Sequence, residues 1–207
     1  MKKEAKRGKR KQEFKKENFF KKHYSLSWQY IKESRNYVLF ALFLFLFFII
    51  VALFYQPPEV VKIIKEFVEK ILKETSGLNW WQLSIYILNN NLGNSFMIML
   101  LGVFFGIFPV FTAVANGYVL GFIAEKSVQT EGLSVLLRLF PHGIFELPAV
   151  IFAIALGIKL GMFWFAQNRK KEFLRRLEQS LRVFLFVILP LLIIAAIIEG
   201  ILINAIG

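Results

Sequence analysis

The sequence predicts an all-α, polytopic integral membrane protein, a bundle of about five transmembrane helices with one amphipathic helix outside the cytoplasm. Apolar residues make up 57% of the 207 residues and charged residues only 19%, whereas soluble domains hold about 45–50% and about 25%. The apolar residues gather in long uncharged stretches, and the positive charge gathers in two segments between them. Composition and patterning therefore agree on a chain that lipid must cover.

Residues 1–36 form a basic tail that we expect in the cytoplasm. The tail holds 13 Lys and Arg against four Glu, which supplies +9 of the net charge of +12. Nucleic-acid binding is one interpretation of such a tail. We favour a positive-inside signal that also contacts anionic lipid, because apolar spans follow directly. We therefore expect no nucleic-acid partner, and residues 37–207 form a single membrane domain.

The first expected span is residues 37–55, which carry no charge over 19 positions. A helix of this length crosses about 30 Å of hydrocarbon. Pro57 and Pro58 end this helix, because a proline in a helix interior removes a backbone hydrogen bond and clashes with the preceding turn. Residues 58–75 then combine an apolar stripe with a charged face at helical spacing. They predict an amphipathic helix that lies on the extracytoplasmic membrane surface or on a partner.

The apolar stretch 82–124 is too long for one crossing. Pro109 near its middle divides it into expected spans at 83–105 and 109–127. The uncharged turn between them, around 106–108, either reaches the cytoplasm or lies within the membrane, buried by protein.

The last expected spans are 141–166 and 183–205, separated by a loop with six positive residues against two Glu. If both basic segments are cytoplasmic, an even number of crossings must separate them. With two spans over 82–124, four crossings separate the basic segments. A single span there would leave three, which is an odd number. The count is therefore five, with the N-terminus in the cytoplasm and the C-terminus outside.

Ionisable residues within spans are candidates for function, because a charge in hydrocarbon is costly. His142 and Glu146 lie one helical turn apart on one face of the fourth expected span. A rise of about 1.5 Å per residue along the last expected span places Glu199 at a similar depth in the membrane. We predict that the three form one polar cluster. It could hold a divalent metal through His142 and Glu146, relay protons, or simply join the helices. Lys159 lies nearer the cytoplasmic end, where its side chain can reach the interface.

Amides and glycines inside spans are typical of close helix packing in membranes, and amides can also line a polar pathway. The expected packing motif consists of Asn90, Asn91, Asn116, Gly117, Gly121, Pro141, Pro148, Gly157 and Gly161. The sequence holds no cysteine, no G-x-S-x-G elbow and no Walker A motif. Thiol catalysis, elbow-type hydrolysis and P-loop nucleotide hydrolysis therefore have no support, and no catalytic residue is assigned.

A resemblance to a known family covers about residues 85–165. It rests on Asn90-Asn91, Asn116-Gly117-x-x-x-Gly121, the stretch PHGIFELPA over residues 141–149, and Gly157-x-x-x-Gly161. These residues resemble the stage II sporulation protein M family. The resemblance implies a five-span fold and, in spore-forming bacteria, a multispan anchor in a peptidoglycan-remodelling complex. It also implies that His142 and Glu146 belong to the family's polar motif.

We therefore expect a non-enzymatic integral membrane scaffold or anchor of a cell-envelope complex, acting through residues 58–75 and the basic faces. One alternative is a small-solute or cation transporter that uses His142, Glu146 and Glu199. Another is an intramembrane metal-dependent hydrolase. The expected partners are the lipid bilayer and membrane or envelope proteins, and a homo-oligomer stays open. A divalent metal at His142 and Glu146 is the one cofactor considered.

Overall fold

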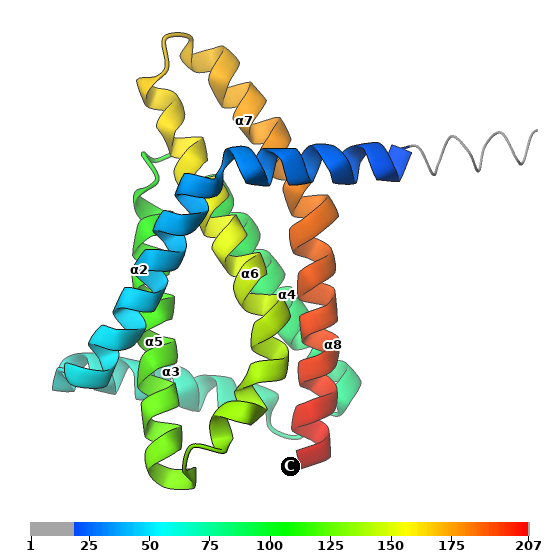
Figure 1. Ribbon diagram of the computed structural model, residues 1–207. Helices are drawn as coiled ribbons and strands as arrows, with labels where there is room; N and C mark the ends of the chain where they lie inside the picture. Colours follow the sequence, from blue (N-terminus) through cyan, green and yellow to red (C-terminus); the bar gives the residue numbers. More distant parts are fainter. Residues whose placement is uncertain (1–18, 207) are drawn as a thin grey trace, which may run out of the picture.

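The computed structural model describes residues 19–206, and within that range the side chains of residues 135–142 and 204–206 lie outside the description. Every element of the described chain is helical. The helices that run lengthwise through the molecule (Figure 1) are α2 (Arg35–Phe54), α4 (Trp80–Leu101), α5 (Ile107–Glu131), α6 (Val135–Gly161) and α8 (Leu189–Ile206). The predicted all-α bundle is confirmed.

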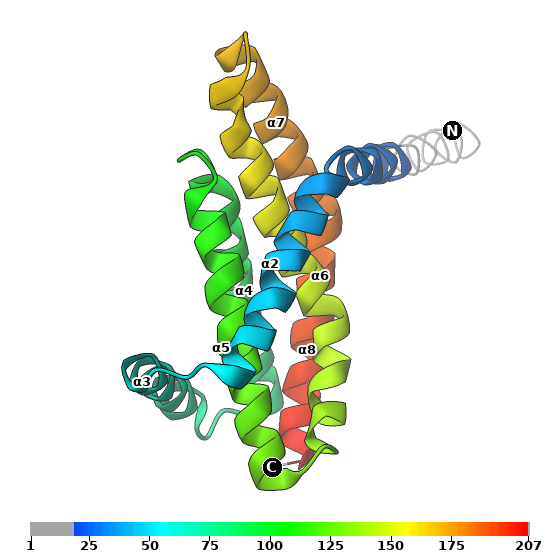
Figure 2. The same ribbon diagram turned by 60° about the vertical axis from the view of Figure 1, so that its left-hand side comes forward.

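The two ends of the bundle differ in chemistry. Helix α3 (Pro58–Thr75) lies across one end, and we call this the α3 end. At the other end lie α7 (Arg169–Val183) and a helix over residues 19–33 that points away from the bundle (Figure 1). We call this the basic end. The described chain begins at the basic end and finishes at the α3 end (Figure 2).

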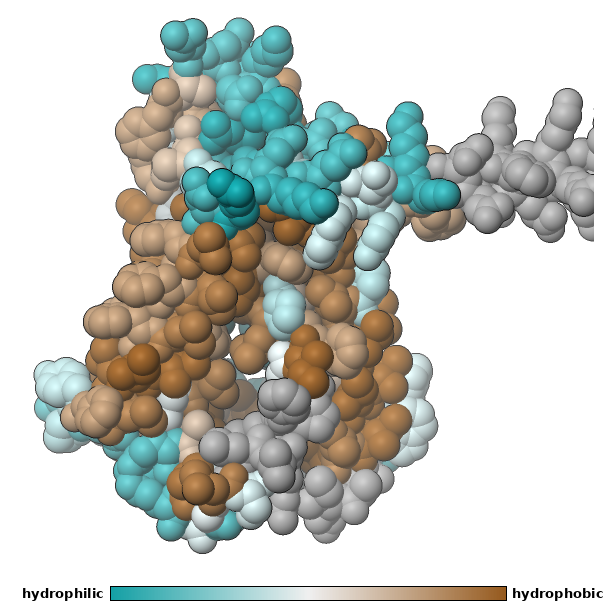
Figure 3. Space-filling model, viewed as in Figure 1, coloured by the Kyte–Doolittle hydropathy of each residue, from teal (hydrophilic) through white to brown (hydrophobic). Residues whose placement is uncertain are grey.

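The lengthwise helices form an apolar belt. Within the described residues, four segments are long and apolar enough to cross a bilayer: Arg35–Phe54, Ile107–Glu131, Gly143–Phe165 and Arg169–Ile203. In the space-filling view, brown apolar surface fills the middle of the molecule, and hydrophilic surface lies toward both ends (Figure 3). The protein is therefore an integral membrane protein. Helix α4 runs beside these segments but carries four asparagines, so the count of five spans stays a prediction.

Helix α3 has the bounds that the sequence predicts. Pro58 occupies its first turn, where a missing N–H costs nothing. Gly77, at a φ of +78°, turns the chain just after its end. Helix α4 then begins at Trp80, because the side chains of Asn79 and Gln82 exchange hydrogen bonds with each other's backbone N–H.

The turn between α4 and α5 lies earlier than predicted. It occupies residues 102–106 rather than 106–108, and Pro109 falls inside the first turn of α5. The chain reverses through Phe105 and Gly106, at φ values of +56° and +73°. Glycine adopts this left-handed conformation without a steric penalty, so Gly106 and not Pro109 sets the turn.

Two segments expected as loops are mostly helical. The basic loop is helix α7, which continues through a π-helical turn (Phe184–Ile188) into α8. The connection between the expected spans 109–127 and 141–166 shrinks to residues 132–134, because α5 reaches Glu131 and α6 begins at Val135. Helix α6 therefore begins six residues before the predicted fourth span and ends five residues before its predicted end, and the last span continues α7 without a break.

Glycines set the distances between the lengthwise helices. Gly117 and Gly121 of α5 lie so close to α2 that a Cβ on either would overlap the carbonyl oxygen of Phe45 or Ile49. Gly161 at the end of α6 lies equally close to the backbone of the turn between α4 and α5. Close backbone approach of this kind replaces the hydrophobic driving force that lipid removes.

Candidate functional site

A cavity of about 580 Å³ lies between α2, α4, α5 and α6, and we call it the amide cavity. Its polar lining comes from three helices: Asn90, Asn91, Asn94 and Ser95 of α4, Thr112 and Asn116 of α5, and Glu146 of α6. Phe67 of α3 also lines it. In Figure 3 the apolar belt is hollowed between α2 and α6. The cavity is thus mostly apolar and partly open, with one polar side on which Asn90, Asn94 and Asn116 are exposed.

Helical spacing brings the amides together. Asn90 and Asn94 are one turn apart on α4, and the Asn94 Nδ2 donates to the Asn90 Oδ1 at 3.2 Å. Counted from the turn between α4 and α5, Asn90 lies about 17 Å along α4 and Asn116 about 14 Å along α5. The amides of the two helices therefore lie at a similar depth.

Helix α6 contributes Glu146 and a backbone acceptor. Glu146 is partly buried, one turn from the start of the described side chains of this helix. Pro148 lies in the helix interior and has no N–H, so the carbonyl of Ile144 lacks the donor that an α-helix would supply. Ile144 lines the amide cavity. The proline thus adds acceptor capacity beside the carboxylate.

A second cavity of about 560 Å³ adjoins the first. The two share Asn90, Asn91 and Glu146 in their linings, and the second also includes Glu199 of α8. Leu72 and Thr75 of α3 lie on its border. Glu146 and Glu199 are therefore placed on one cavity, near the α3 end.

The predicted cluster of His142, Glu146 and Glu199 is only partly visible. The side chains of Pro141 and His142 lie outside the described residues. Among the residues that are described, no three His, Cys, Asp or Glu side chains are arranged to hold a metal ion. The cluster and the metal site at His142 and Glu146 both stay predictions.

The residues assigned to the packing motif have two different positions. The three amides Asn90, Asn91 and Asn116 face a cavity. The four glycines Gly117, Gly121, Gly157 and Gly161 lie at contacts between helices. Spacing alone did not separate the two sets, because which side of α4 faces the bundle depends on contacts with α6 and α8.

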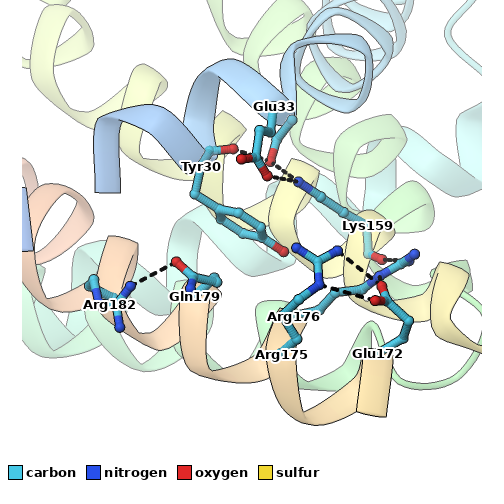
Figure 4. A network of polar contacts seen from close by, with 9 residues as sticks. Tyr30, Glu33, Lys159, Glu172, Arg175, Arg176, Gln179 and Arg182 are labelled. Atoms are coloured by element: carbon cyan, nitrogen blue, oxygen red, sulfur yellow. Dashed lines mark hydrogen bonds and ion pairs between the residues drawn. The ribbon is translucent and has the colours of Figure 1, made fainter. Parts of the chain in front are cut away.

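A buried lysine marks the basic end (Figure 4). Lys159 of α6 is 6% exposed. Its Nζ donates to the Ser34 Oγ at 2.9 Å, lies 3.7 Å from the ring centre of Tyr30, and lies 4.0 Å from the Glu33 carboxylate. The sequence suggested that Lys159 reaches the interface. Instead, the helix over residues 19–33, which the sequence did not predict, covers it.

Further polar contacts join this lysine to α7. The Arg176 Nη1 donates to the carbonyl oxygen of Lys159 at 2.7 Å, and Arg175 and Arg176 both bind the Glu172 carboxylate at 3.0–3.1 Å (Figure 4). Burial raises the pKa of the Tyr30 hydroxyl to about 12, so this ring stays neutral beside the ammonium group. These hydrogen bonds, ion pairs and the cation–π contact connect the helix over residues 19–33 with α6 and, through Lys159, with α7.

One known protein and one protein family are similar to this chain. The chain is 31% identical over 113 residues to the uncharacterized protein MJ0706 of Methanocaldococcus jannaschii, a match that covers 52% of this chain and 51% of that relative. The match thus spans about half the length of the relative. No solved structure matches the chain. The model of the family described as stage II sporulation protein M matches residues 38–202, from α2 almost to the end of α8. Since that match spans the whole helical bundle, the chain belongs to the stage II sporulation protein M family.

Proposed function

We propose that this protein is a non-enzymatic membrane anchor that holds a partner protein at the cell envelope. In this proposal the basic end lies in the cytoplasm and α3 lies outside. The observation that carries the proposal is helix α3, a long amphipathic helix that contacts the bundle at Ile64 and presents a charged face outward.

Helix α3 contacts the bundle through part of its apolar stripe, because Phe67 and Leu72 of that stripe are exposed. Ile64 is 4% exposed and packs in a small core with Ala52 of α2 and Phe122 of α5. The segment before α3 also forms hydrogen bonds with α5. The Tyr118 hydroxyl donates to the Tyr55 carbonyl oxygen at 2.6 Å, and the Gln56 amide donates to the Glu125 carboxylate at 3.1 Å. The helix is therefore oriented by α2 and α5 together.

The opposite face of α3 carries eight exposed charged residues of both signs. They are Glu59, Lys62, Lys65, Glu66, Glu69, Lys70, Lys73 and Glu74. Ion pairs along the helix are long and exposed, such as Lys62 with Glu66 at 3.9 Å, so they contribute little to stability. A surface of mixed charge supports selective recognition of a protein with the complementary pattern.

Photo-crosslinking tests the anchor. With a photoreactive amino acid at Lys65, we expect one discrete protein adduct in membranes of the source organism, lost when Glu69 and Lys73 are reversed in charge. The same probe at Phe43, an exposed α2 residue in the apolar belt, is the matched control and should give lipid adducts. Identical products at both positions, or an adduct that survives charge reversal, would contradict the proposal.

Because the chain has no cysteine, a Lys65→Cys variant also tests on which side of the membrane α3 lies: only an impermeant maleimide added outside should label it.

A second candidate function is passage of a small solute or cation. The observation in its favour is the pair of adjoining cavities, since Glu146 lines both and Glu199 lines the one nearer α3. Carboxylates inside a membrane protein commonly mark ion or proton routes.

Flux through liposomes tests this second candidate. With purified protein and encapsulated calcein, Mn²⁺ entry should quench the dye, and Glu199→Gln should reduce the rate to that of empty liposomes. Glu59→Gln, on the outer face of α3, should leave the rate unchanged. Quenching no faster than in empty liposomes with the unaltered protein would remove this candidate and leave the anchor untouched.

A further inference from the structure

We propose that a groove at the basic end binds one anionic phospholipid. The groove, which we call the lipid groove, lies between the helix over residues 19–33 and the segment where the π-helical turn joins α8. Its volume is about 560 Å³, and its lining consists of Phe20, Lys21, Tyr24, Leu185, Phe186 and Pro190. The inference is independent of the anchor function, because the lipid groove includes no residue of α3.

The helix over residues 19–33 places the lipid groove at the membrane surface. This helix crosses the end of the bundle and extends sideways from it (Figure 1). In the space-filling view it lies where the hydrophilic surface of the basic end meets the apolar belt (Figure 3). Helices that lie in the plane of a bilayer occupy the boundary between head groups and acyl chains. The lipid groove therefore opens at the level of the head groups, and α8 leads from it into the apolar belt.

Aromatic side chains support this placement. Phe20, Tyr24 and Trp28 follow one another at intervals of four residues, so they share one face of the helix. All three are exposed, by 61%, 57% and 45%. Tyrosine and tryptophan are enriched at the level of the head groups, because each combines an apolar ring with a polar atom that can bond to water or lipid. This face of the helix is thus suited to contact lipid.

Protein contacts near both ends of this helix hold the walls of the lipid groove together. Near one end, the His23 ring stacks on the Phe186 ring with centres 5.2 Å apart, and the Phe20 ring meets the same ring edge-on at 6.1 Å. Just beyond the other end, the Ser34 Oγ accepts a hydrogen bond from the Lys159 Nζ at 2.9 Å. The protein itself therefore forms the groove, and a lipid does not have to create it.

The wall along α8 is suited to an acyl chain. Leu185 is 57% exposed, Pro190 is exposed as well, and Ile193 continues the exposed apolar surface along α8. The acyl chains of a bilayer are as apolar as these side chains, so contact with this wall orients a chain but adds little selectivity. The preference for one phospholipid over another must therefore come from the head group.

Lys21 and Tyr24 supply that preference. A lysine ammonium group is a common partner of phosphate, and a tyrosine hydroxyl can donate a second hydrogen bond. Residues 1–36 hold 13 Lys and Arg against four Glu, so the carboxylates of this segment can neutralise only a minority of its positive charges. A lipid with a net negative charge is attracted by this surplus, whereas the choline of a zwitterionic lipid brings a positive charge of its own.

Native mass spectrometry of the full chain in detergent tests the inference. The probes are a phosphatidylglycerol and a phosphatidylcholine with the same acyl chains. We expect the first phosphatidylglycerol to bind at least about tenfold more tightly than the first phosphatidylcholine, the ratio that one charged hydrogen bond supplies. Glycerol 3-phosphate at millimolar concentration should not displace the lipid, because it lacks the acyl chains that contact α8.

Two pairs of variants locate the site. Lys21→Gln should weaken binding of the first phosphatidylglycerol about tenfold. Lys22→Gln removes the same charge from the same helix, but Lys22 lies about 100° further round the helix and lines none of the cavities described above, so binding should change little. Leu185→Trp should fill the lipid groove and weaken binding to a similar extent as Lys21→Gln. Leu39→Trp is its control, because Leu39 is equally exposed but lies on α2, away from the groove.

Equal effects of Lys21→Gln and Lys22→Gln would show that the basic tail attracts anionic lipid as a whole, and would overturn the inference. Equal binding of the two lipids, displacement by glycerol 3-phosphate, or unchanged binding in the Leu185→Trp variant would overturn it too. All four substituted side chains are exposed, so the variants should fold. The α3 adduct tests the anchor function separately, and none of these results changes what that adduct means.

Discussion

Replacing Gly161 with alanine is expected to destabilise the bundle strongly. A Cβ at this position would overlap the backbone nitrogen of Gly106 and the carbonyl oxygen of Gly102. Both atoms belong to the turn between α4 and α5, so neither can move aside as a flexible side chain would. Overpacking of this kind costs about 1–3 kcal/mol or more. In a chain of this length, about 3 kcal/mol corresponds to a fall in Tm of roughly 6–12 °C.

Gly93→Ala is the matched control for Gly161→Ala. The same methyl group on Gly93, within α4, would meet no atom within 4 Å. Alanine is a better helix former than glycine by about 1 kcal/mol, so the Tm should stay the same or rise slightly. The Tm of both variants can be followed by intrinsic fluorescence of the purified protein. Equal Tm values for the two variants would show that the turn is free to move away from α6.

The turn between α4 and α5 also packs against the end of α6 at the basic end of the membrane domain. The Trp164 Nε1 donates to the Val103 carbonyl oxygen at 2.8 Å, and the rings of Phe105 and Trp164 stack with centres 5.2 Å apart. The backbone N–H of Gly106 donates to the Gly102 carbonyl oxygen at 2.8 Å. Protein groups therefore accept or donate hydrogen bonds at part of this turn, while the side chains of Phe104 and Phe105 stay exposed.

The features that the sequence predicts well depend on local signals. Helix α3 has a stripe of period 3.6, a proline in its first turn and a glycine beyond its end, and no distant residue is needed to define it. The spans are equally local, because length and apolarity alone identify them. The turn at 102–106 was misplaced for the same reason: Pro109 is the stronger local signal, but a proline in the first turn of a helix does not break it.

The features that the sequence does not predict depend on distant contacts. The helix over residues 19–33 holds four charged residues among 15, and its anchors are Lys159 and Phe186, far along the chain. The role of the amides was undecidable from spacing, because Asn90 and Asn116 look alike whether they face a helix or a cavity. Counting residues did place Glu146 and Glu199 near one another in depth, and both line the second cavity.

Replacing Lys159 with methionine is expected to release the helix over residues 19–33 from the bundle. Methionine keeps the length and the apolar stem of the side chain but removes the ammonium group. The variant loses the hydrogen bond to Ser34 and the contact with the Tyr30 ring. A charged hydrogen bond contributes about 1.5–3 kcal/mol, and a cation–π contact shielded from water about 2 kcal/mol. Since the two are not additive, we expect a loss of roughly 3 kcal/mol in the free energy of local opening.

Hydrogen–deuterium exchange measures this opening directly. A loss of roughly 3 kcal/mol raises the exchange rate of protected amides on the order of a hundredfold, and the increase should be confined to residues 19–33. Lys126→Met is the matched control, because Lys126 also pairs with a carboxylate at 3.1 Å and lies 5.7 Å from an aromatic ring centre, yet its side chain is 43% exposed. Exposed pairs contribute about 0–1 kcal/mol, so exchange in this variant should change little. If Lys159→Met leaves residues 19–33 as protected as in the unaltered protein, then aromatic contacts such as that between His23 and Phe186, and not the buried lysine, hold this helix in place.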